Sequence, residues 1–412
     1  MHSDVIVLGA GIVGIGLALN LQEKGRSVTL IDRSGPGEGT SFGNAGLIQR
    51  EAVKPYSFPD DPLTLLQAAL NMRVDSSYQL GSLGTVGPWL YEYWKQSSAQ
   101  NVARSAAARA PLFEICISEH EKLAALAGAS AQLRPGGWIK VYQKEKSLAE
   151  EIDKVNEVAA YGVVGEVMDH RALAAAEPHL TGEFIGAVKW SQGYNLAEPL
   201  ALSRAYADLF LRRGGRFVSG DARSLRQDGD DWSVTTAEGV ESARDCVVAL
   251  GPWANDITEP LGYAMPLGVK RGYHMHYSAK GNAVLNSPVL DADGGYLIAP
   301  MTHGIRLTTG AEFAIRDAPP NYRQLERAEP LARTIFPLAE RVDREPWLGR
   351  RPCTPDMIPV MGPAPRHRGL WFSFAHAHHG LTLAGCAGRF MAELIAGETP
   401  FCDPSPYRAD RF

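Results

Sequence analysis

The chain has 412 residues, of which 45% are hydrophobic and 21% charged, and its formal net charge is −5. This length supports a large buried core divided over two or three lobes. The weak negative charge argues against a protein that binds nucleic acid through its phosphates. The five cysteines are scattered, without the paired spacing of a zinc site, so we expect reduced thiols, no metal and a cytoplasmic location.

The first residues predict a strand, a tight turn, a helix and a second strand. Asp4–Leu8 is a short apolar run typical of a buried parallel strand, and Gly9 interrupts it. Ile12–Lys24 has helical length and is followed by glycine, and Ser27–Asp32 alternates as a strand. The apolar run Val5–Leu19 is shorter than the roughly 20 residues of a membrane span and lacks the charged start of a signal peptide.

The turn between strand and helix carries the G-x-G-x-x-G pattern of dinucleotide-binding proteins. Its residues are Gly9, Ala10, Gly11, Ile12, Val13 and Gly14. Gly9 permits the turn, Gly11 leaves room for a pyrophosphate, and Gly14 lets the helix approach the strand. The helix N-terminus would stabilise the phosphate charge. Asp32, at the end of the second strand, can accept hydrogen bonds from both ribose hydroxyls, which argues against NADP but leaves FAD and NAD open.

The rest of the chain predicts loops over 34–62 and then a mixed region with much antiparallel character. We expect helices at Leu63–Leu70, Ala99–Leu126, Ser147–Tyr161, Glu198–Arg213, Tyr322–Ile335 and Leu381–Ala396. We expect strands at Gly137–Gln143, Gly186–Trp190, Arg216–Ser219, Trp232–Thr236, Asp245–Leu250 and Trp371–Ala375, with a mixed β region over 267–312. The strand–helix pairs at both ends suggest two lobes, each assembled from discontinuous segments.

Two further segments resemble the D-amino acid oxidase superfamily of flavoenzymes. Residues 39–46 read GTSFGNAG, and a strand at Val247–Leu250 leads into the sequence GPWA at 251–254. In that superfamily a Thr-Ser pair contacts FAD phosphate, an Asn-Ala-Gly stretch passes the isoalloxazine ring, and a turn ending in Gly-x-Trp closes over the cofactor. Beside the fingerprint and Asp32, the resemblance implies FAD contacts from Arg33, Thr40, Ser41, Asn44, Ala45, Gly46, Gly251 and Trp253.

The C-terminal part carries the strongest resemblance. Residues 349–356 read GRRPCTPD, 359–362 read PVMG and 376–382 read HAHHGLT, close to the family patterns G-x-R-P-x-T-P-D, P-x-x-G and G-H-x-x-x-G-L-T. Ala375 stands where the family often has glycine before the histidine. Gly380, Leu381 and Thr382 open the last helix, whose positive end would face the flavin pyrimidine edge and stabilise the charge of reduced flavin, with a hydroxyl donor from Thr382.

The resemblance also implies a substrate site. Arg351 corresponds to the arginine that holds the substrate carboxylate, since a guanidinium offers two parallel hydrogen bonds. Arg350 is the alternative ligand, and an ion pair that binds no substrate is the other interpretation. Tyr296 and Tyr273 are candidate donors to the same carboxylate. His379 is a candidate to line the substrate pocket or adjust the flavin, with ordinary loop packing as the alternative. A metal site is not expected, because the loop has no acidic or cysteine cluster nearby.

The flavin is expected to bind without a covalent bond. Sarcosine oxidases in the same superfamily attach flavin to a cysteine five residues before the threonine of the Thr-Pro-Asp motif. That position is Gly349 in this chain, whereas Cys353 directly precedes the threonine. The resemblance therefore implies non-covalent FAD.

The fold class that follows is α/β, with two domains. We expect a Rossmann-type, D-amino acid oxidase-like FAD-binding domain formed by residues 1–85, 193–262 and 345–412. The second is an α+β substrate domain on a mixed, largely antiparallel sheet, formed by residues 86–192 and 263–344. The resemblance covers nearly the whole chain.

The implied activity is oxidation of a small amino acid, with a hydride passing from Cα to flavin N5 while the amine is neutral, which depends on orientation and desolvation. The short Asn-Ala-Gly start is most similar to bacterial D-amino acid dehydrogenases, which pass electrons to a quinone or another acceptor. The D stereochemistry comes from the resemblance alone.

Three alternatives stay open. The first is secondary-amine oxidation of hydroxy-D-proline, sarcosine or opine type. The second is a flavin subunit of a hetero-oligomer that is inactive without its partners, and the third is an NAD-dependent dehydrogenase. Peripheral attachment to the inner membrane also stays open.

Overall fold

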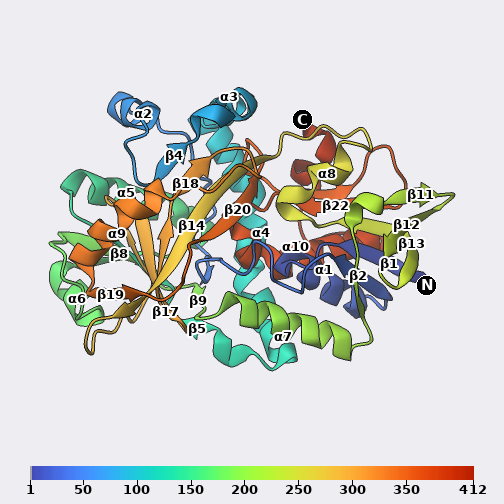
Figure 1. Ribbon diagram of the computed structural model, residues 1–412, viewed down its shortest axis with the longest axis horizontal. Coiled ribbons are helices and arrows are strands. Elements are labelled where there is room, and N and C mark those ends of the chain that lie inside the picture. The colour runs from blue at the N-terminus through green and yellow to red at the C-terminus, as the bar shows by residue number, and fades with distance from the viewer. Residues whose placement is uncertain (1) are drawn as a thin grey trace.

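The computed structural model describes residues 2–412 and contains two large β-sheets side by side, each covered by its own helices (Figure 1). The helices are α1 (Ile12–Glu23), α2 (Pro62–Ala69), α3 (Leu83–Gln96), α4 (Ala99–Ala127), α5 (Glu145–Val158), α6 (His170–Ala176), α7 (Pro199–Arg212), α8 (Asn255–Thr258), α9 (Arg323–Ile335) and α10 (Gly380–Ile395). Within residues 2–412, no helix combines the length and apolar character needed to cross a bilayer.

The first sheet has eight strands in the order β10-β2-β1-β13-β12-β11, with β22 beside β13 and β21 beside β22. These are β1 (His2–Leu8), β2 (Val28–Asp32), β10 (Arg216–Ser219), β11 (Arg226–Asp228), β12 (Asp231–Thr236), β13 (Gly239–Val248), β21 (Val360–Pro363) and β22 (Leu370–Phe374). The central strands are parallel, with Val5 opposite Val28 on one side and Asp245 on the other. Both faces are covered, which is why β1 is almost continuously apolar.

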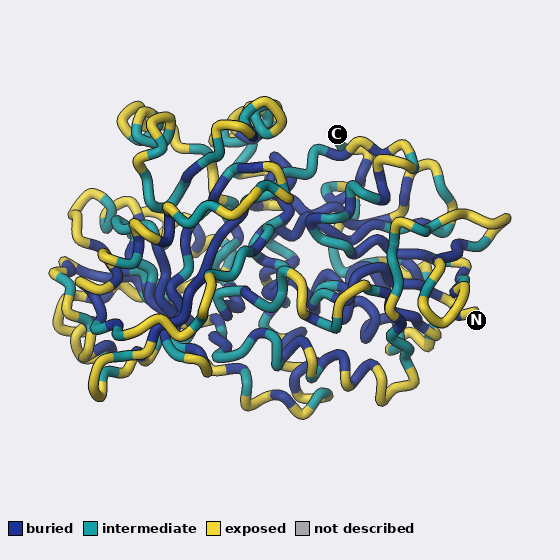
Figure 2. Tube along the Cα trace, viewed as in Figure 1, coloured by how far each residue is buried: buried dark blue, intermediate teal, exposed yellow. Residues whose placement is uncertain are grey.

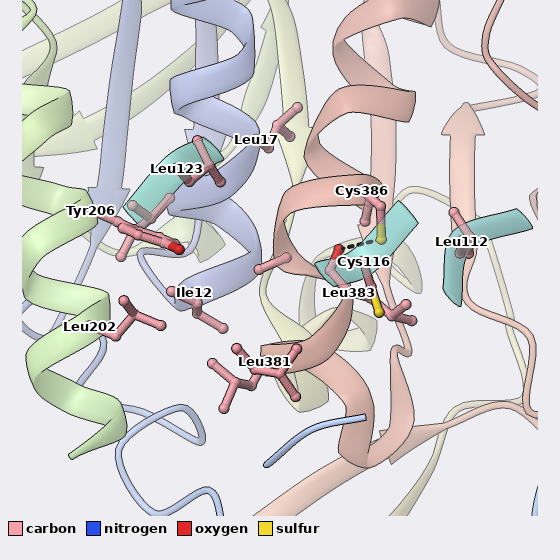
Figure 3. Close-up of a cluster of buried hydrophobic side chains, with 14 of the residues drawn as sticks. Ile12, Leu17, Leu112, Cys116, Leu123, Leu202, Tyr206, Leu381, Leu383 and Cys386 are labelled. Atoms are coloured by element: carbon pink, nitrogen blue, oxygen red, sulfur yellow. Dashed lines mark hydrogen bonds between the residues drawn. The ribbon is translucent and has the colours of Figure 1, made fainter. Parts of the chain in front are cut away.

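Alternate side chains of β1 enter two different cores. Val5 and Val7 pack with α1, α4, α7 and α10, whereas Ile6 and Leu8 pack with the region around α8. Figure 3 shows the first of these cores, where helices distant in sequence meet. Its closest helix contact is made through glycine: a Cβ on Gly16 of α1 would lie 2.5 Å from the carbonyl oxygen of Ala384 in α10.

The second sheet has eleven strands, nine of them in the order β4-β18-β14-β17-β16-β15-β6-β8-β7, and β19 and β20 also pair with β14. These are β4 (Ser76–Tyr78), β6 (Trp138–Tyr142), β7 (Glu166–Asp169), β8 (Gly186–Trp190), β14 (Gly268–Ala279), β15 (Val289–Asp291), β16 (Tyr296–Met301), β17 (Gly304–Thr309), β18 (Ala311–Phe313), β19 (Leu338–Arg341) and β20 (Trp347–Cys353). Most pairs are antiparallel, and the β6–β15 and β4–β18 pairs are parallel. The prediction of a mixed, largely antiparallel sheet is confirmed.

A small third sheet joins the two lobes. It consists of β3 (Leu47–Ile48), β9 (Tyr194–Asn195) and β5 (Arg134–Pro135). Figure 2 shows buried chain within both large sheets and between them. The residues between the sheets are therefore held on both sides by packed structure.

Most predicted elements are present within a few residues, and the helices α3, α6 and α8 were not predicted. Strand pairing adds detail to the expected domain boundaries, which stay a prediction. β4 and β20 hydrogen-bond into the eleven-stranded sheet, although residues 1–85 and 345–412 were expected in the FAD-binding domain. The long strand β14 pairs along 268–274 with β20 on one edge and with β17 and β18 on the other, and β4 pairs with β18.

Candidate active site between the two sheets

A cavity of about 990 Å³ runs from the first sheet to the second. Binding pockets typically enclose about 300–1,000 Å³, so this space can hold a large cofactor with a small substrate. At one end it is lined by the turn after β1, the end of β2 and the loop at 39–45. At the other end it is lined by β14, β20 and residues 376–381.

The backbone geometry agrees with the tight turn expected at Gly9 and with the close approach expected at Gly14. Gly9 has a φ of +108°, and a Cβ there would lie 2.5 Å from the carbonyl oxygen of Ala249. A Cβ on Gly14 would lie 1.9 Å from the carbonyl oxygen of Gly9, so only glycine lets the helix pass this close to the turn. Gly14 itself does not line the cavity, whereas Gly9, Gly11, Ile12 and Val13 do.

Asp32 and Ser41 accept hydrogen bonds from backbone N–H groups at the start of α1. The Asp32 carboxylate accepts the Ala10 N–H at 2.7 Å with one oxygen and the Ser34 N–H at 3.0 Å with the other. Each oxygen keeps a second lone pair for a hydroxyl. Ser41 Oγ accepts the Ile12 N–H at 3.0 Å, so this first-turn donor is already used by the protein. The Ser41 hydroxyl proton remains available to a ligand in the cavity.

Trp253 marks the same end of the cavity. It closes the short turn Gly251–Trp253, in which Gly251 has a φ of +55°. The Arg33 guanidinium lies 5.1 Å from the Trp253 ring centroid, and those of Arg316 and Arg350 lie 6.0 Å away. Arg33, Gly251 and Trp253 all line the cavity, as the sequence predicts for cofactor-binding residues.

The loop at 40–46 is fixed mainly through its backbone. The Thr40 hydroxyl donates to the Arg350 carbonyl at 3.1 Å. Asn44 Oδ1 accepts the Gly46 N–H at 2.8 Å, and the Asn44 carbonyl accepts from the Arg306 guanidinium. Thr40, Ser41, Asn44 and Ala45 line the cavity, but Gly46 does not. The Gly46 carbonyl instead accepts the Leu196 N–H at 2.7 Å.

The last helix begins at the cavity, with one departure from expectation. α10 starts at Gly380, and Gly380 and Leu381 line the cavity with first-turn N–H groups that have no partner inside the helix. Thr382 does not line it. Its hydroxyl lies 3.3 Å from the Leu47 carbonyl and accepts the Gln49 N–H at 3.2 Å, so it joins α10 to β3. The expected donation from Thr382 to flavin does not agree with this geometry.

Arg351 and Arg350 point to different places, as adjacent residues of a strand must. Arg351 donates to the Gly310 carbonyl at 2.8 Å and the Thr309 carbonyl at 3.3 Å, and a Cβ on Gly272 would lie 2.4 Å from its Nη2. Arg350 Nε donates to the Arg316 carbonyl at 3.0 Å. Within residues 2–412, Arg351 has no ion pair with a carboxylate, so its positive charge is available to a ligand.

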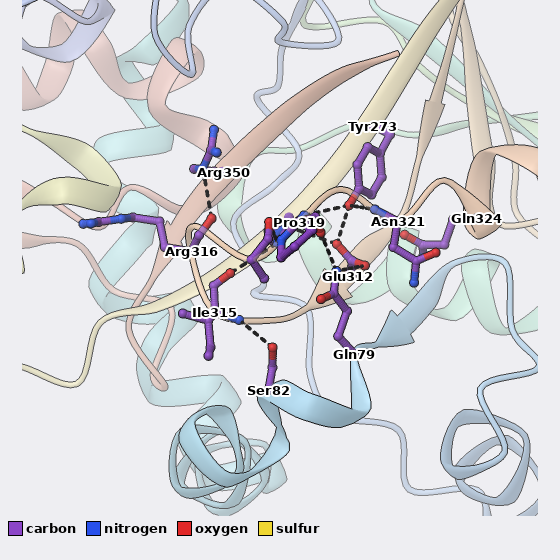
Figure 4. Close-up of polar contacts among 12 residues, drawn as sticks. Gln79, Ser82, Tyr273, Glu312, Ile315, Arg316, Pro319, Asn321, Gln324 and Arg350 are labelled. Carbon is purple, nitrogen blue, oxygen red and sulfur yellow. Dashed lines mark hydrogen bonds and ion pairs between the residues drawn. The ribbon is translucent and has the colours of Figure 1, made fainter. Parts of the chain in front are cut away.

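The two candidate tyrosines do not offer their hydroxyls to the cavity. Tyr296 is 1% exposed, does not line the cavity, and donates to Asp291 Oδ2 at 2.9 Å. Tyr273 borders the cavity, but its hydroxyl donates to Glu312 Oε2 at 2.6 Å and accepts from Arg271 at 2.9 Å (Figure 4). Both hydroxyls are satisfied by the protein, so neither fits the expected role as a carboxylate ligand.

His379 lines the cavity together with a residue that the sequence analysis missed, Arg109 of α4. Arg109 Nη2 lies 3.3 Å from His379 Nδ1, which must accept because a guanidinium only donates. His379 Nε2 and His376 Nε2 are buried without a partner among the described residues. Burial lowers the pKa of His376 to about 4. These unpartnered nitrogens fit a cavity that holds a polar ligand.

Lys270 of β14 is the second cation that sequence reasoning missed. Its Nζ lies 3.9 Å from the Tyr93 ring centroid, with Trp89 and Phe313 at 5.7 and 5.8 Å. All four residues except Trp89 line the cavity. Lys270 comes from the expected substrate domain, but a strand pattern alone does not reveal which of its faces meets a cavity.

Comparison with known proteins identifies the family. Residues 4–394 match the family model of the D-amino acid oxidase type, described as FAD dependent oxidoreductase. The chain belongs to this family of FAD-dependent oxidoreductases. The cavity fits the cofactor, because it extends from Asp32 past the side-chain-free Gly11 to the start of α10. At that end the unpartnered Nε2 atoms of His376 and His379 can bond to polar atoms of a ligand.

Relatives in the family are similar over their full lengths. A D-amino-acid oxidase from Bradyrhizobium diazoefficiens is 28% identical, over 99% of this chain and 98% of that protein. A D-amino acid dehydrogenase from Granulibacter bethesdensis is 27% identical, over 99% of each. The expectation of a flavoenzyme of this family is thus confirmed, and the alternative of an NAD-dependent dehydrogenase is wrong.

Solved structures with the same fold include glycine oxidase from Geobacillus kaustophilus, with a TM-score of 0.76 and 20% identity over 100% of this chain and 99% of that one. Iminodiacetate oxidase from Chelativorans has a TM-score of 0.72 and 20% identity over 98% of both chains. At this identity the likeness establishes the fold alone.

Proposed function

We propose that the protein is a D-amino acid dehydrogenase that oxidises the bond between Cα and nitrogen and passes electrons to a quinone or another acceptor. The observation that carries the proposal is the Arg351 guanidinium, which lines the cavity near residues 376–381 and has no carboxylate partner among residues 2–412. The names of the relatives support the choice, because they include a D-amino acid oxidase and D-amino acid dehydrogenases.

FAD, held by the fingerprint, Asp32, Ser41 and the start of α10, would supply the acceptor for the hydride that leaves Cα. The protein's own part is to bind, orient and dry the substrate. Arg351 binds the carboxylate with its Nε and the outward side of its guanidinium, while the Thr309 and Gly310 carbonyls fix its orientation. A cluster of buried side chains that lines the same cavity, Tyr93, Cys353, Met357 and Ala377, limits access of water.

Burial keeps the neighbouring histidines neutral. It is the first cause that holds the pKa of His378 and His379 well below the usual value, and nearby positive charges add to it. A neutral imidazole does not repel a substrate ammonium group while the amine loses its proton. The resulting imino acid hydrolyses in water to a keto acid and ammonia when the nitrogen is primary.

The electron acceptor would approach near α2 and α3. Thr64 and Ala68 of α2 and Tyr93 of α3 line the cavity, so these helices border it. Their outer surfaces expose large apolar side chains at Leu63, Leu66, Leu70, Tyr91 and Trp94. This surface supports the proposal of a quinone acceptor with peripheral contact to the inner membrane from a cytoplasmic location. Assembly into a hetero-oligomer remains the alternative use of the same surface.

A second candidate is oxidation of a secondary amine. It is favoured by one observation: solved structures of the same fold include iminodiacetate oxidase and an L-proline dehydrogenase. A secondary amine would use the same carboxylate site at Arg351 and differ only in what surrounds the nitrogen.

The test is anaerobic reduction of the purified, FAD-loaded chain by D-amino acids, L-amino acids and N-alkyl amino acids, followed by loss of flavin absorbance. Bleaching by D-amino acids supports the proposal, and bleaching by N-alkyl substrates alone supports the second candidate. Failure of every amino acid to bleach the flavin contradicts both. Reoxidation with a quinone analogue, with a dye and with oxygen then identifies the acceptor, and flotation with anionic lipid vesicles tests membrane contact.

A further inference from the structure

Lys270 and Arg351 lie directly opposite each other on the antiparallel strands β14 and β20. Directly opposed residues of such a pair point to the same face of the sheet. Both side chains line the cavity. Like charges in this arrangement destabilise a sheet unless an opposite charge lies nearby, so the pair calls for an explanation.

The protein itself supplies no opposite charge to Lys270. Among residues 2–412 its Nζ has no ion pair, and it rests against the aromatic rings of Tyr93, Trp89 and Phe313. Such rings stabilise a cation weakly, by about 0.5–2 kcal/mol, and do not neutralise it. Arg351 bonds to carbonyl groups only.

A third cation lies at the same end of the cavity. Arg109 is 3% exposed and donates to the Ala52 carbonyl at 2.8 Å and to His379. Arg109, Lys270 and Arg351 are the charged groups that act on His378, whose ring is tilted by 44° against that of His379 with the centroids 3.7 Å apart. Three positively charged side chains among the described residues therefore act on His378.

We propose that this end of the cavity binds an amino acid with two carboxylates, in which Arg351 takes the carboxylate on the oxidised carbon and Lys270 takes the second one. The inference rests on the proposed function and narrows it to dicarboxylate substrates. The second carboxylate belongs either to an acidic side chain or to an N-carboxyalkyl group. Either group would present the same carboxylate to Lys270. The two differ in whether that carboxylate is attached through the α-carbon or through the nitrogen.

The strand geometry fits this use. Paired residues on adjacent strands have Cβ atoms about 4.5–5.5 Å apart, and long side chains that diverge from there can hold two carboxylates separated by a few bonds. Arg351 leans toward Thr309 and Gly310, whereas Lys270 leans toward Tyr93 of α3. Arg109, on the α4 side, adds long-range attraction for a doubly charged anion.

The first experiment needs no substitution. The FAD-loaded enzyme is titrated with succinate and with butyrate, and binding is followed by the shift of the flavin spectrum. We expect succinate to bind about 10–100-fold more tightly, since a hydrogen bond to a charged group contributes about 1.5–3 kcal/mol. Equal binding of the two would overturn the inference, whether or not any amino acid is oxidised.

The second experiment compares flavin reduction by substrates with and without the second carboxylate: D-aspartate with D-asparagine, D-glutamate with D-glutamine, and iminodiacetate with sarcosine. We expect kcat/KM to favour the dicarboxylate in one of these pairs, and the preferred pair identifies where the second carboxylate lies. Equal rates within every pair would overturn the inference and leave the proposed function standing. No reduction by any of them, with reduction by another D-amino acid, would overturn the inference and leave the proposed function standing. Failure of every amino acid in the wider panel would contradict the proposed function, while the succinate titration still decides the inference.

Lys270→Gln should reduce the preference for the dicarboxylate about 10-fold or more, and Lys270→Arg should retain most of it. The matched control is Lys280→Gln. Lys280 is exposed and directly follows β14, so loss of its charge should leave the preference for the dicarboxylate unchanged. A preference that survives Lys270→Gln at full strength would overturn the role of Lys270.

Discussion

Arg271 and Glu312 form a buried ion pair between β14 and β18, with Nε 3.1 Å from Oε2 and side-chain exposures of 0% and 1%. Glu312 also accepts from the Tyr273 hydroxyl and from Gln79 Nε2 (Figure 4). Removing one member of such a pair leaves an uncompensated buried charge. Glu312→Leu should therefore lower the free energy of unfolding by about 3–5 kcal/mol, measured by urea denaturation of the FAD-loaded protein.

The exposed pair Arg408–Asp410 is the control for this prediction, with exposures of 58% and 42%. Asp410→Asn should change the same free energy by less than about 1 kcal/mol. If both substitutions had equally small effects, the Arg271–Glu312 pair would not stabilise the sheet.

Tyr273→Phe separates a structural role from a substrate role. The hydroxyl donates to Glu312 and accepts from Arg271, so its loss should reduce the free energy of unfolding by about 1–3 kcal/mol. KM for the amino acid should change much less than it does in Arg351→Ala. A large rise in KM with an unchanged unfolding midpoint would instead restore Tyr273 as a carboxylate ligand.

Arg351→Ala should raise KM for the amino acid about 100-fold or more, because a charged, two-pronged contact with the carboxylate is lost. FAD content, measured by absorbance after gel filtration, should be retained. The KM of Arg351→Lys should lie between those of the unsubstituted enzyme and Arg351→Ala, since lysine keeps the charge and loses the planar guanidinium. Arg350→Gln is the neighbouring control and should raise KM far less. Unchanged substrate affinity in Arg351→Ala would disprove the assignment.

The preference for a dicarboxylate should depend on pH. Burial lowers the pKa of Lys270 to about 8, so the free enzyme loses this positive charge as the pH rises through that value. The ratio of kcat/KM for the acidic substrate to that for its amide should therefore be highest below pH 8 and decline above it, because kcat/KM reports the free enzyme. Comparison of this pH profile with that of Lys270→Arg removes the contribution of the substrate amine. In Lys270→Arg the ratio should stay flat over the same range.

Stability should fall in mild acid because of His120. This side chain is fully buried, with Nε2 2.7 Å from the Leu381 carbonyl and Nδ1 3.1 Å from the Tyr206 hydroxyl. Burial lowers its pKa from 6.5 to about 4. Below pH 6.5, the pKa of His120 in the unfolded chain, the unfolded chain binds a proton that the folded chain does not bind. The contribution of neutral His120 to stability is therefore complete above pH 6.5 and is lost as the pH falls toward 4.

The loss from this one group is about 3 kcal/mol over that interval. Denaturation at pH 7 and pH 4.5 should show a smaller drop in His120→Gln than in the unsubstituted protein, although the variant is less stable at pH 7. An identical drop in both proteins would mean that His120 does not contribute to the acid sensitivity.

The sequence by itself determined the parts of the site whose residues are close together in the chain. Gly9, Gly11 and Gly14 are spaced by the geometry of one turn and one helix, and Asp32 ends the strand that follows. Local sterics impose this spacing on any chain that must bring its backbone near a dinucleotide. The same holds for the start of α10, where Gly380 follows directly on the loop that lines the cavity.

Only the tertiary structure decided which polar groups remain free for a ligand. Tyr296 and Thr382 have hydroxyl groups that could bind a ligand. In the folded protein the Tyr296 hydroxyl donates to Asp291 and the Thr382 hydroxyl donates to the Leu47 carbonyl. Lys270 lies opposite Arg351, and Arg109 lies beside His379. The two members of each pair are too far apart in the sequence for a local pattern to predict their contact. A strand presents alternate residues to opposite faces, and which face meets the cavity depends on the pairing of β14 with β20, a contact between segments about 80 residues apart.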